Sequence, residues 1–460
     1  MNPLQALGMM EASPGDRIEI SGSVRPTSSL AWLIAWGAKG SLAVTDQALF
    51  AGAQFALNIL LARWLAPAGY GAFAVAYSVY LLGSAVHGAL LVEPMIVFGS
   101  GRHFKMRSEY LGIVVRGHWL LTTLMSTTLF AAGFLIARLH SLAISHALYA
   151  LGLALPFTLL VELTRRAFYV EMKPGHAALG GAVYFCILMA IAAALRAGRL
   201  LTASAAILAM GLASSLTATV QLVRLRSQWP RVAGKLSVID VASEHWGYGR
   251  WVLAAVLPSW TLLNLFYVVL PMWFGLEASG ALKAIMNLAM PATHSLIAFG
   301  MLTMPLFIRH RDGGGDRFMQ RTVRRVAGLF IAGTALYPVG LWLFRVPIIS
   351  FLYGGKYLEY SGLPVLLAGC VPLVTACSVV FGAGLRAFER PDRVFCANVA
   401  ASSVSLTLGL RLTANWGVRG AVAGYLVSYG ALAAGLWLLY RGLRPDISGE
   451  VNAAPERPSR

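Results

Sequence analysis

The chain has 460 residues, of which 58% are hydrophobic and 12% charged, and its mean hydropathy is +0.68. Soluble domains carry about a quarter charged residues, so this composition excludes a soluble fold, and the long apolar runs exclude the short alternating strands of a membrane barrel. The net charge of +18 lies in short loops between apolar runs, which indicates anionic membrane lipids and not nucleic acid as the partner.

Apolar runs of about 20 residues recur along the chain, and each is long enough to cross a bilayer as a helix. We expect an all-α integral membrane protein with about twelve transmembrane helices. Their predicted ranges are 41–62, 71–97, 112–137, 146–164, 177–195, 201–223, 251–274, 280–307, 325–344, 361–385, 394–413 and 418–440. Trp32 and Trp36 precede the first span as expected interfacial anchors.

Most of the 37 lysines and arginines fall in alternate loops and in the two tails. The positive-inside rule therefore places these loops and both termini in the cytoplasm. The short outer loops leave no room for an extracellular domain. The predicted organisation is a cytoplasmic tail (1–40), an N-lobe with helices 1–6 (41–223), a basic cytoplasmic linker (224–250), a C-lobe with helices 7–12 (251–441) and a cytoplasmic tail (442–460).

Two segments indicate an internal duplication. Residues 62–73 (ARWLAPAGYGAF) and 271–282 (PMWFGLEASGAL) each join the first two helices of a half, and aligning their tryptophans also aligns Gly71 with Gly280. A second echo lies where the fourth and tenth spans end, in residues 166–168 and 386–388, both Arg-Ala-Phe. Two lobes of one orientation predict a pseudo-two-fold axis along the membrane normal and a substrate path between the lobes.

The opening turn at 62–73, the segment FLYGGKY (351–357) and the segment GVRGAVAGYLVSYG (417–430) resemble motifs of a flippase family. In these three motifs the chain resembles the polysaccharide export and flippase (Wzx-like) branch of the multidrug/oligosaccharidyl-lipid/polysaccharide exporter superfamily. The resemblance implies a MATE-like bundle of two six-helix lobes around a central cavity. It also implies alternating access that moves a lipid-linked oligosaccharide, a cargo whose anionic diphosphate suits the basic inner face.

Polar side chains inside transmembrane helices are costly and often functional, so they supply the cavity candidates. The first half contributes Asp46, Gln47, Gln54 and Asn58 on the first helix and Tyr77, Tyr80 and His87 on the second. Tyrosine rings stack on sugars, although the same spacing also suits plain helix packing. The Asp46 carboxylate is either linked to a cation or hydrated at the inner interface.

The second half contributes Asn264 and Tyr267 on the seventh helix, and Lys283, Asn287 and His294 on the eighth. The Lys283 ammonium would hold a diphosphate or snorkel to the outer headgroups. The histidines either carry protons or pack between helices. Arg166 and Arg386 are candidates for an inner gate or for diphosphate capture, and the alternative is that both simply obey the positive-inside rule.

Nothing in the sequence indicates a catalytic residue, a metal site or a cofactor, so we do not expect an enzyme. Gly313-Gly314-Gly315 lacks the Lys-Ser/Thr of a phosphate-binding loop and is expected to be a flexible inner linker. The four cysteines lie in predicted spans without metal-binding spacing.

The function predicted is a flippase of the bacterial inner membrane that translocates a polyprenyl-diphosphate-linked oligosaccharide for exopolysaccharide, capsule or O-antigen assembly. It would work with a polysaccharide polymerase and the export machinery. The first alternative is a cation-coupled multidrug exporter of the same fold. The second is a membrane glycosyltransferase or polysaccharide polymerase, which would need a large outer loop or an acidic cluster.

Overall fold

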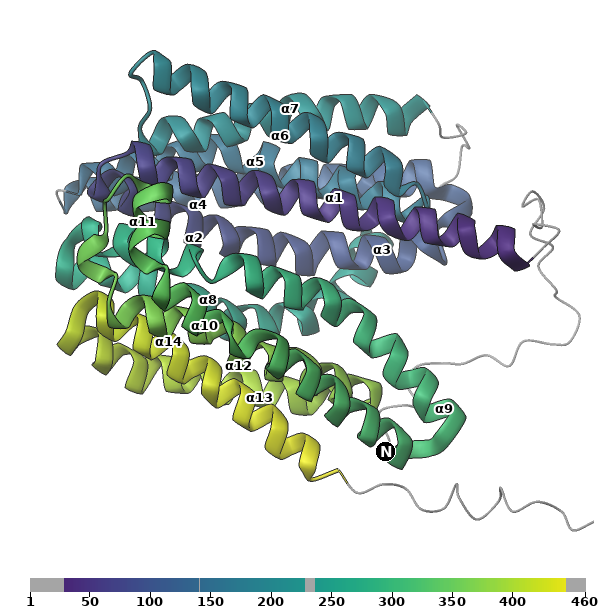
Figure 1. Ribbon diagram of the computed structural model, residues 1–460. Coiled ribbons are helices and arrows are strands. Elements are labelled where there is room, and N and C mark those ends of the chain that lie inside the picture. Colours follow the sequence, from purple (N-terminus) through teal and green to yellow (C-terminus); the bar gives the residue numbers. More distant parts are fainter. Residues whose placement is uncertain (1–28, 140, 228–235, 444–460) are drawn as a thin grey trace, which may run out of the picture.

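The computed structural model describes residues 29–139, 141–227 and 236–443, and all regular structure within them is helical. The first half contains α1 (Ser29–Trp64), α2 (Pro67–His87), α3 (Glu93–Ser100), α4 (Arg107–Arg138), α5 (Leu142–Val170), α6 (Pro174–Ala197) and α7 (Ala203–Ser227). The second contains α8 (Val238–Asn287), α9 (Met290–Ala335), α10 (Tyr337–Leu343), α11 (Arg345–Tyr353), α12 (Leu363–Ala387), α13 (Pro391–Val404) and α14 (Leu410–Arg441). Figure 1 shows the long helices side by side in one bundle.

Two π-helical segments interrupt the helices. The first, η2 (Gly88–Val92), joins α2 to α3, and the second, η5 (Ser405–Gly409), joins α13 to α14. Each inserts one wide turn into an otherwise continuous transmembrane helix, which re-aims the side chains on either side of it.

Eleven helical segments of the described residues are long and apolar enough to cross a membrane. Two of them, Val238–Asn287 and Pro391–Arg441, run through a sharp glycine turn, at Gly275 (φ 77°) and Gly417 (φ 54°). Positive φ is the left-handed region in which glycine is at ease, so each turn separates two antiparallel helices. Residues 276–287, after the first of these turns, cover the eighth predicted span together with Met290–Arg311. The segments thus accommodate the twelve predicted spans, and the all-helical fold is confirmed.

Three helix boundaries differ from the sequence-based ranges. Helix α1 begins at Ser29, so Trp32 and Trp36 lie on the first transmembrane helix and not in a preceding tail. Helix α8 begins at Val238, inside the predicted linker, where the Ser237 hydroxyl accepts the Asp240 backbone N–H as an N-cap. The expected glycine linker is helical apart from a turn at Gly315 (φ 71°), because a single left-handed residue is enough to reverse the chain. Residues 1–28, 228–235 and 444–460 of the predicted tails and linker lie outside the described residues.

The two halves meet through the glycines that the sequence repeat aligned. A Cβ built on Gly71 of α2 would lie 1.8 Å from the Leu276 carbonyl oxygen of α8, and one on Gly280 would lie 2.4 Å from the Pro67 carbonyl oxygen. The alignment that equates Gly71 with Gly280 also equates Pro67 with Leu276, so these contacts are reciprocal. Reciprocal contacts of this kind are expected where a pseudo-two-fold axis passes between two helices.

The second sequence repeat, at residues 166–168 and 386–388, does not match the alignment of the two halves that their backbone turns give. Met172 and Glu389 share left-handed conformations (φ 56° and 60°), and a proline follows each two residues later as the first residue of α6 or α13. Aligning these turns places Arg386 opposite Tyr169, about one helical turn beyond Arg166. Arg166 and Arg386 therefore do not occupy equivalent positions in the two halves.

The first turn of α1 and the last turn of α14 lie at the same end of the bundle, here called the terminal end (Figure 1). At the opposite, distal end, α2 packs on α8, and α1 packs on α11. Toward the terminal end, α9 packs on α12 of its own half and diverges from α1 (Figure 1). The halves are thus joined distally and separate along α1 and α9 toward the terminal end (Figure 1). On the other side of the bundle they stay in contact there, where Glu244 of α8 pairs with Arg102 and His103 of the first half and His245 contacts Tyr110.

Candidate functional site

The centre of the interface between the halves holds a buried lysine between two tyrosine rings. Lys283 on α8 is 7% exposed, and its Nζ lies 4.8 Å from the ring centroid of Tyr77 and 5.3 Å from that of Tyr267. Both rings offer their electron-rich faces to the ammonium group. Tyr77 comes from α2 of the first half, so this cage joins the two halves.

No carboxylate or hydrogen-bond acceptor among the described residues lies against the Lys283 ammonium. Two tyrosine faces compensate only part of the solvation that burial removes from a charge. The site is therefore electrostatically incomplete and suited to receive an anion. The predicted cavity residue His294 is exposed on α9.

A stack of aromatic rings runs along α2 beside this cage. Ring centroids are separated by 6.1 Å between Tyr70 and Phe73, 5.6 Å between Phe73 and Tyr77, and 5.5 Å between Tyr77 and Tyr80. These residues follow helical spacing, which places them on one face. Contact of Tyr77 and Tyr80 with a cargo sugar stays a prediction.

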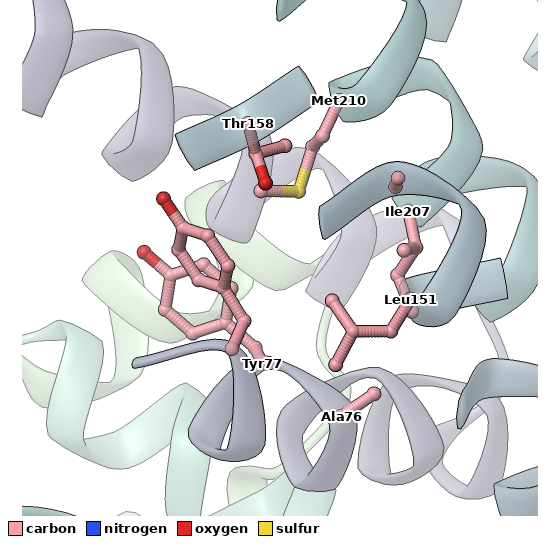
Figure 2. Close-up of a pocket in the computed structure, with 8 residues that line it drawn as sticks. Ala76, Tyr77, Leu151, Thr158, Ile207 and Met210 are labelled. Atoms are coloured by element: carbon pink, nitrogen blue, oxygen red, sulfur yellow. The ribbon is translucent and has the colours of Figure 1, made fainter. Parts of the chain in front are cut away.

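Behind Tyr77 and Tyr80 lies a pocket within the first half, between α2, α5 and α7. The space inside it is about large enough for one water molecule. The lining residues are Ala76, Tyr77, Tyr80, Leu151, Ala154, Thr158, Ile207 and Met210. Figure 2 shows the Tyr77 ring on one side of the pocket and Leu151, Ile207 and Met210 on the other.

Two predicted cavity asparagines join the halves through a shared tyrosine. Asn287 Nδ2 donates to the Tyr70 hydroxyl at 2.8 Å, and that hydroxyl donates to Asn58 Oδ1 at 3.4 Å. All three side chains are buried. Asn58 and Asn287 thus contact protein partners in this conformation, and Gln54 likewise donates to the Tyr184 hydroxyl at 2.9 Å.

Asp46 belongs to a second polar cluster, inside the first half. The Arg165 Nε lies 3.4 Å from Asp46 Oδ2, which also accepts the Tyr169 hydroxyl at 2.6 Å. Arg165 Nη2 donates to Gln47 Oε1 at 3.2 Å, and its guanidinium lies 4.3 Å from the Phe50 ring centroid. Asp46 and Gln47 therefore form this cluster and lie apart from the amide network of Asn58.

The arginine in this cluster is Arg165, the neighbour of the predicted gate residue Arg166. Adjacent residues on a helix point about 100° apart, so the two arginines face different surroundings. Arg165 is buried against Asp46, whereas the partly exposed Arg166 pairs with Glu162 at 2.9 Å. Arg386 is exposed and has no ion-pair or hydrogen-bond partner among the described residues.

His87 contacts a residue that the sequence did not single out. Its Nε2 lies 2.9 Å from Nδ1 of His118 on α4, and both imidazoles are buried. His87 is the last residue before the π-helical segment η2. One nitrogen donates and the other accepts, so the contact requires a neutral acceptor ring. Asn264, also buried, has no side-chain hydrogen bond among the described residues.

Cationic side chains close the distal end of the interface. Arg63 Nη1 donates to the Phe351 carbonyl at 2.7 Å, near the C-terminus of α11. Lys356 Nζ donates to the carbonyls of Arg63 and Leu65 at 2.8 and 2.7 Å, at the C-terminus of α1. Each half thus places a cation on the negative end of a helix from the other. Partial burial lowers the pKa of Lys356, with a smaller contribution from the charge of Arg196.

No protein-family model matches the chain, and no curated protein matches it. Several solved structures match the chain. An inward-facing multidrug resistance MATE family transporter of the MOP superfamily has a TM-score of 0.71 at 10% identity, over 87% of this chain and 97% of that one. An outward-facing structure of the same description gives 0.61 at 12% identity, over 92% and 96%.

The lipid II flippase MurJ, in an inward closed conformation, gives a TM-score of 0.67 at 12% identity, over 90% of this chain and 88% of that one. The chain therefore has the fold that these MOP-superfamily multidrug transporters and the MurJ lipid II flippase share.

Proposed function

We propose that the protein is a flippase of the bacterial inner membrane that moves a polyprenyl-diphosphate-linked oligosaccharide to the outer leaflet by alternating access. The observation that carries this proposal is the buried Lys283 ammonium, which has aromatic neighbours and no carboxylate among the described residues. A diphosphate would supply the missing negative charge. Arginine and lysine are the usual partners of phosphate groups.

The surroundings of Lys283 suit a glycan attached to that diphosphate. Tyr77, Tyr80 and Tyr267 offer ring faces for sugars. The polyprenyl chain would stay in the bilayer while the head group crosses between the halves. Loading would take place where α1 and α9 diverge, at the terminal end, which the positive-inside rule assigns to the cytoplasm.

Alternating access requires the distal contacts to open. The Gly71–Gly280 contact and the Arg63 and Lys356 hydrogen bonds hold the distal end closed. All of them join backbone to backbone or side chain to backbone across the interface, so a rigid-body rotation of the halves can break them without unfolding a helix. Release of the cargo would follow this opening.

A cation-coupled multidrug exporter of the same fold is the second candidate, and Asp46 is the residue that would favour it. In this structure the Asp46 carboxylate pairs with Arg165, so a coupling cation would have to displace a guanidinium group.

A glycosyltransferase is disfavoured on related grounds, because the Glu162 carboxylate is also paired, with Arg165 and Arg166. Neither carboxylate is free to act as an acid or a base.

We also propose the cellular setting: synthesis of exopolysaccharide, capsule or O-antigen, together with a polysaccharide polymerase and export machinery. Contacts with anionic lipids would be made by the basic loops. The proposal needs no cofactor. The coupling of transport would come from an ion gradient or from consumption of the cargo on the far side.

Deletion of the gene followed by lipid analysis tests the function. The flippase proposal predicts loss of surface glycan and accumulation of glycan-bearing polyprenyl diphosphate in the cytoplasmic leaflet. Restoration by the wild-type gene and not by a Lys283→Met variant would connect the phenotype to the site. Normal surface glycan combined with altered drug tolerance would contradict the flippase and favour the exporter.

A further inference from the structure

Helices α8 and α9 meet inside the eighth predicted span, 280–307, and do not continue into each other. At this break the Leu288 N–H donates to the Ile285 carbonyl at 3.1 Å, three residues earlier. A continuous α-helix would direct this N–H to the carbonyl four residues earlier, which is that of Ala284. The break thus takes the helical donor away from the Ala284 carbonyl.

Tyrosine hydroxyls from the following helices donate to the carbonyls at this break. The Tyr353 hydroxyl of α11 donates to the Ala284 carbonyl at 2.7 Å, and the Tyr337 hydroxyl of α10 donates to the Leu288 carbonyl. Tyr353 and Ala284 are both fully buried. Because a carbonyl without a donor is costly in an apolar interior, these two bonds fasten the end of α8 to α10 and α11.

The bond from Tyr353 lies between the lysine cage and the distal contacts. Its acceptor, Ala284, directly follows Lys283 in the chain. Two residues before Tyr353, the Phe351 carbonyl of the same short helix accepts a hydrogen bond from Arg63 of α1 at 2.7 Å. Figure 1 shows α11 at the distal end of the bundle, beside α1. One series of contacts therefore joins the cage to the residues that hold the distal end closed.

We propose that Tyr353 and Tyr337 are positioning residues that transmit the binding of cargo at Lys283 to the distal end. A phosphate group draws the ammonium away from its two tyrosine rings and moves the last turns of α8 with it. Because the break separates these turns from α9, the movement passes through the tyrosine hydroxyls to α10 and α11. The Phe351 carbonyl then withdraws from Arg63, and the distal end opens. The inference rests on the proposed flippase function and adds how cargo triggers opening.

The test measures the distal end with spin labels at Ala66 and Glu359, in the full-length protein with its four native cysteines replaced. The added ligand is a polyprenyl-diphosphate-linked glucose. In wild type it should raise the long-distance population about fivefold or more, the usual size of coupling between two sites. Tyr353→Phe keeps the ring and removes the hydroxyl. It should keep the ligand-free distances and a ligand dissociation constant within about threefold of wild type, and reduce the rise to below about twofold.

Tyr337→Phe removes the second bond and should also reduce the rise, so it provides the test if Tyr353→Phe does not fold. Tyr357→Phe is the matched control, because its hydroxyl has no hydrogen-bond partner among the described residues and its ring lies 5.7 Å from that of Tyr353. It should respond as wild type does.

Three results would overturn the inference and leave the flippase function standing. The first is an undiminished rise in the folded tyrosine variants. The second is a distal end that Tyr353→Phe opens before ligand is added, which would show a merely structural bond. The third is a wild type that binds the ligand without any rise. A wild type that does not bind the ligand would overturn the proposed function as well.

Discussion

Replacing Gly71 by alanine should weaken the distal contact between the halves. The added Cβ would lie 1.8 Å from the Leu276 carbonyl oxygen, against an ordinary contact distance of 3.4 Å, so the helices must separate locally by about 1.6 Å. Overpacking of this kind costs about 1–3 kcal/mol. If the strain exists only while the distal end is closed, the ratio of open to closed molecules rises about 5- to 150-fold.

The assay is a distance measurement between spin labels on the two sides of the distal end. Cysteines at Ala66 and Glu359, both exposed, carry the labels in a background in which the four native cysteines are replaced. We expect a new population at longer distance in Gly71→Ala. Gly280→Ala should give the same result, since its Cβ would lie 2.4 Å from the Pro67 carbonyl oxygen.

Gly328→Ala on α9 is the control, because a Cβ at Gly328 meets nothing within 4 Å. It should leave the distance distribution as in wild type. If Gly71→Ala and Gly280→Ala were folded and also kept the wild-type distribution, the distal glycine contact would not govern opening. That result would refute the reasoning from the reciprocal contact.

Two further predictions concern the polar contacts. Arg165→Gln leaves the Asp46 carboxylate buried without its cation, so we expect a loss of about 3–5 kcal/mol in unfolding free energy, measured by thermal unfolding in detergent. Adding Asp46→Asn should restore much of it, and strictly additive losses would contradict the pairing. Lys356→Met and Arg63→Gln should each cost the closed distal end about 0.5–1.5 kcal/mol per lost hydrogen bond and lengthen the spin-label distance. Unchanged distances would show that these contacts do not hold the end closed.

The overall fold could be predicted from the sequence because the lipid environment dictates it. Each apolar run must satisfy its own backbone hydrogen bonds, so hydropathy locates the helices. The ends of the helices were harder to predict from the sequence. Helix α1 includes Trp32 and Trp36 with no helix-breaking residue between them, and hydropathy does not detect the part of a helix that extends beyond the bilayer. The glycine pair at the interface was recognised from the repeat, although its contact required the structure.

The site was predicted in part. Helical spacing identified Tyr77, Tyr267 and Lys283 separately, but only tertiary packing brings residues of different halves into one cage. The choice between Arg165 and Arg166 depended on helix rotation, which a doublet does not reveal. Glu162, a carboxylate within a turn of both arginines, was the available signal that this face is polar.

Other site residues gave no distinguishing signal. Leu151, Ile207 and Met210 of the pocket are apolar residues in apolar helices, and they differ from core residues only in the space left beside them. No pattern in the sequence of its helix distinguishes His118. It is noticed only because its imidazole contacts that of His87 on another helix. Such residues become visible only when the helices are placed relative to one another.

The most direct test of the central claim measures transport by Lys283 variants in liposomes that contain a polyprenyl-diphosphate-linked sugar. Lys283→Met keeps the length of the side chain and removes its charge, and Lys105→Met, at an exposed position between α3 and α4, is the matched control. The account predicts that Lys283→Met slows translocation by about 10- to 100-fold, as expected for a lost charge-assisted contact. Lys283→Arg and Lys105→Met should stay near the wild-type rate. Translocation by Lys283→Met at the wild-type rate would contradict the claim that this lysine binds the diphosphate.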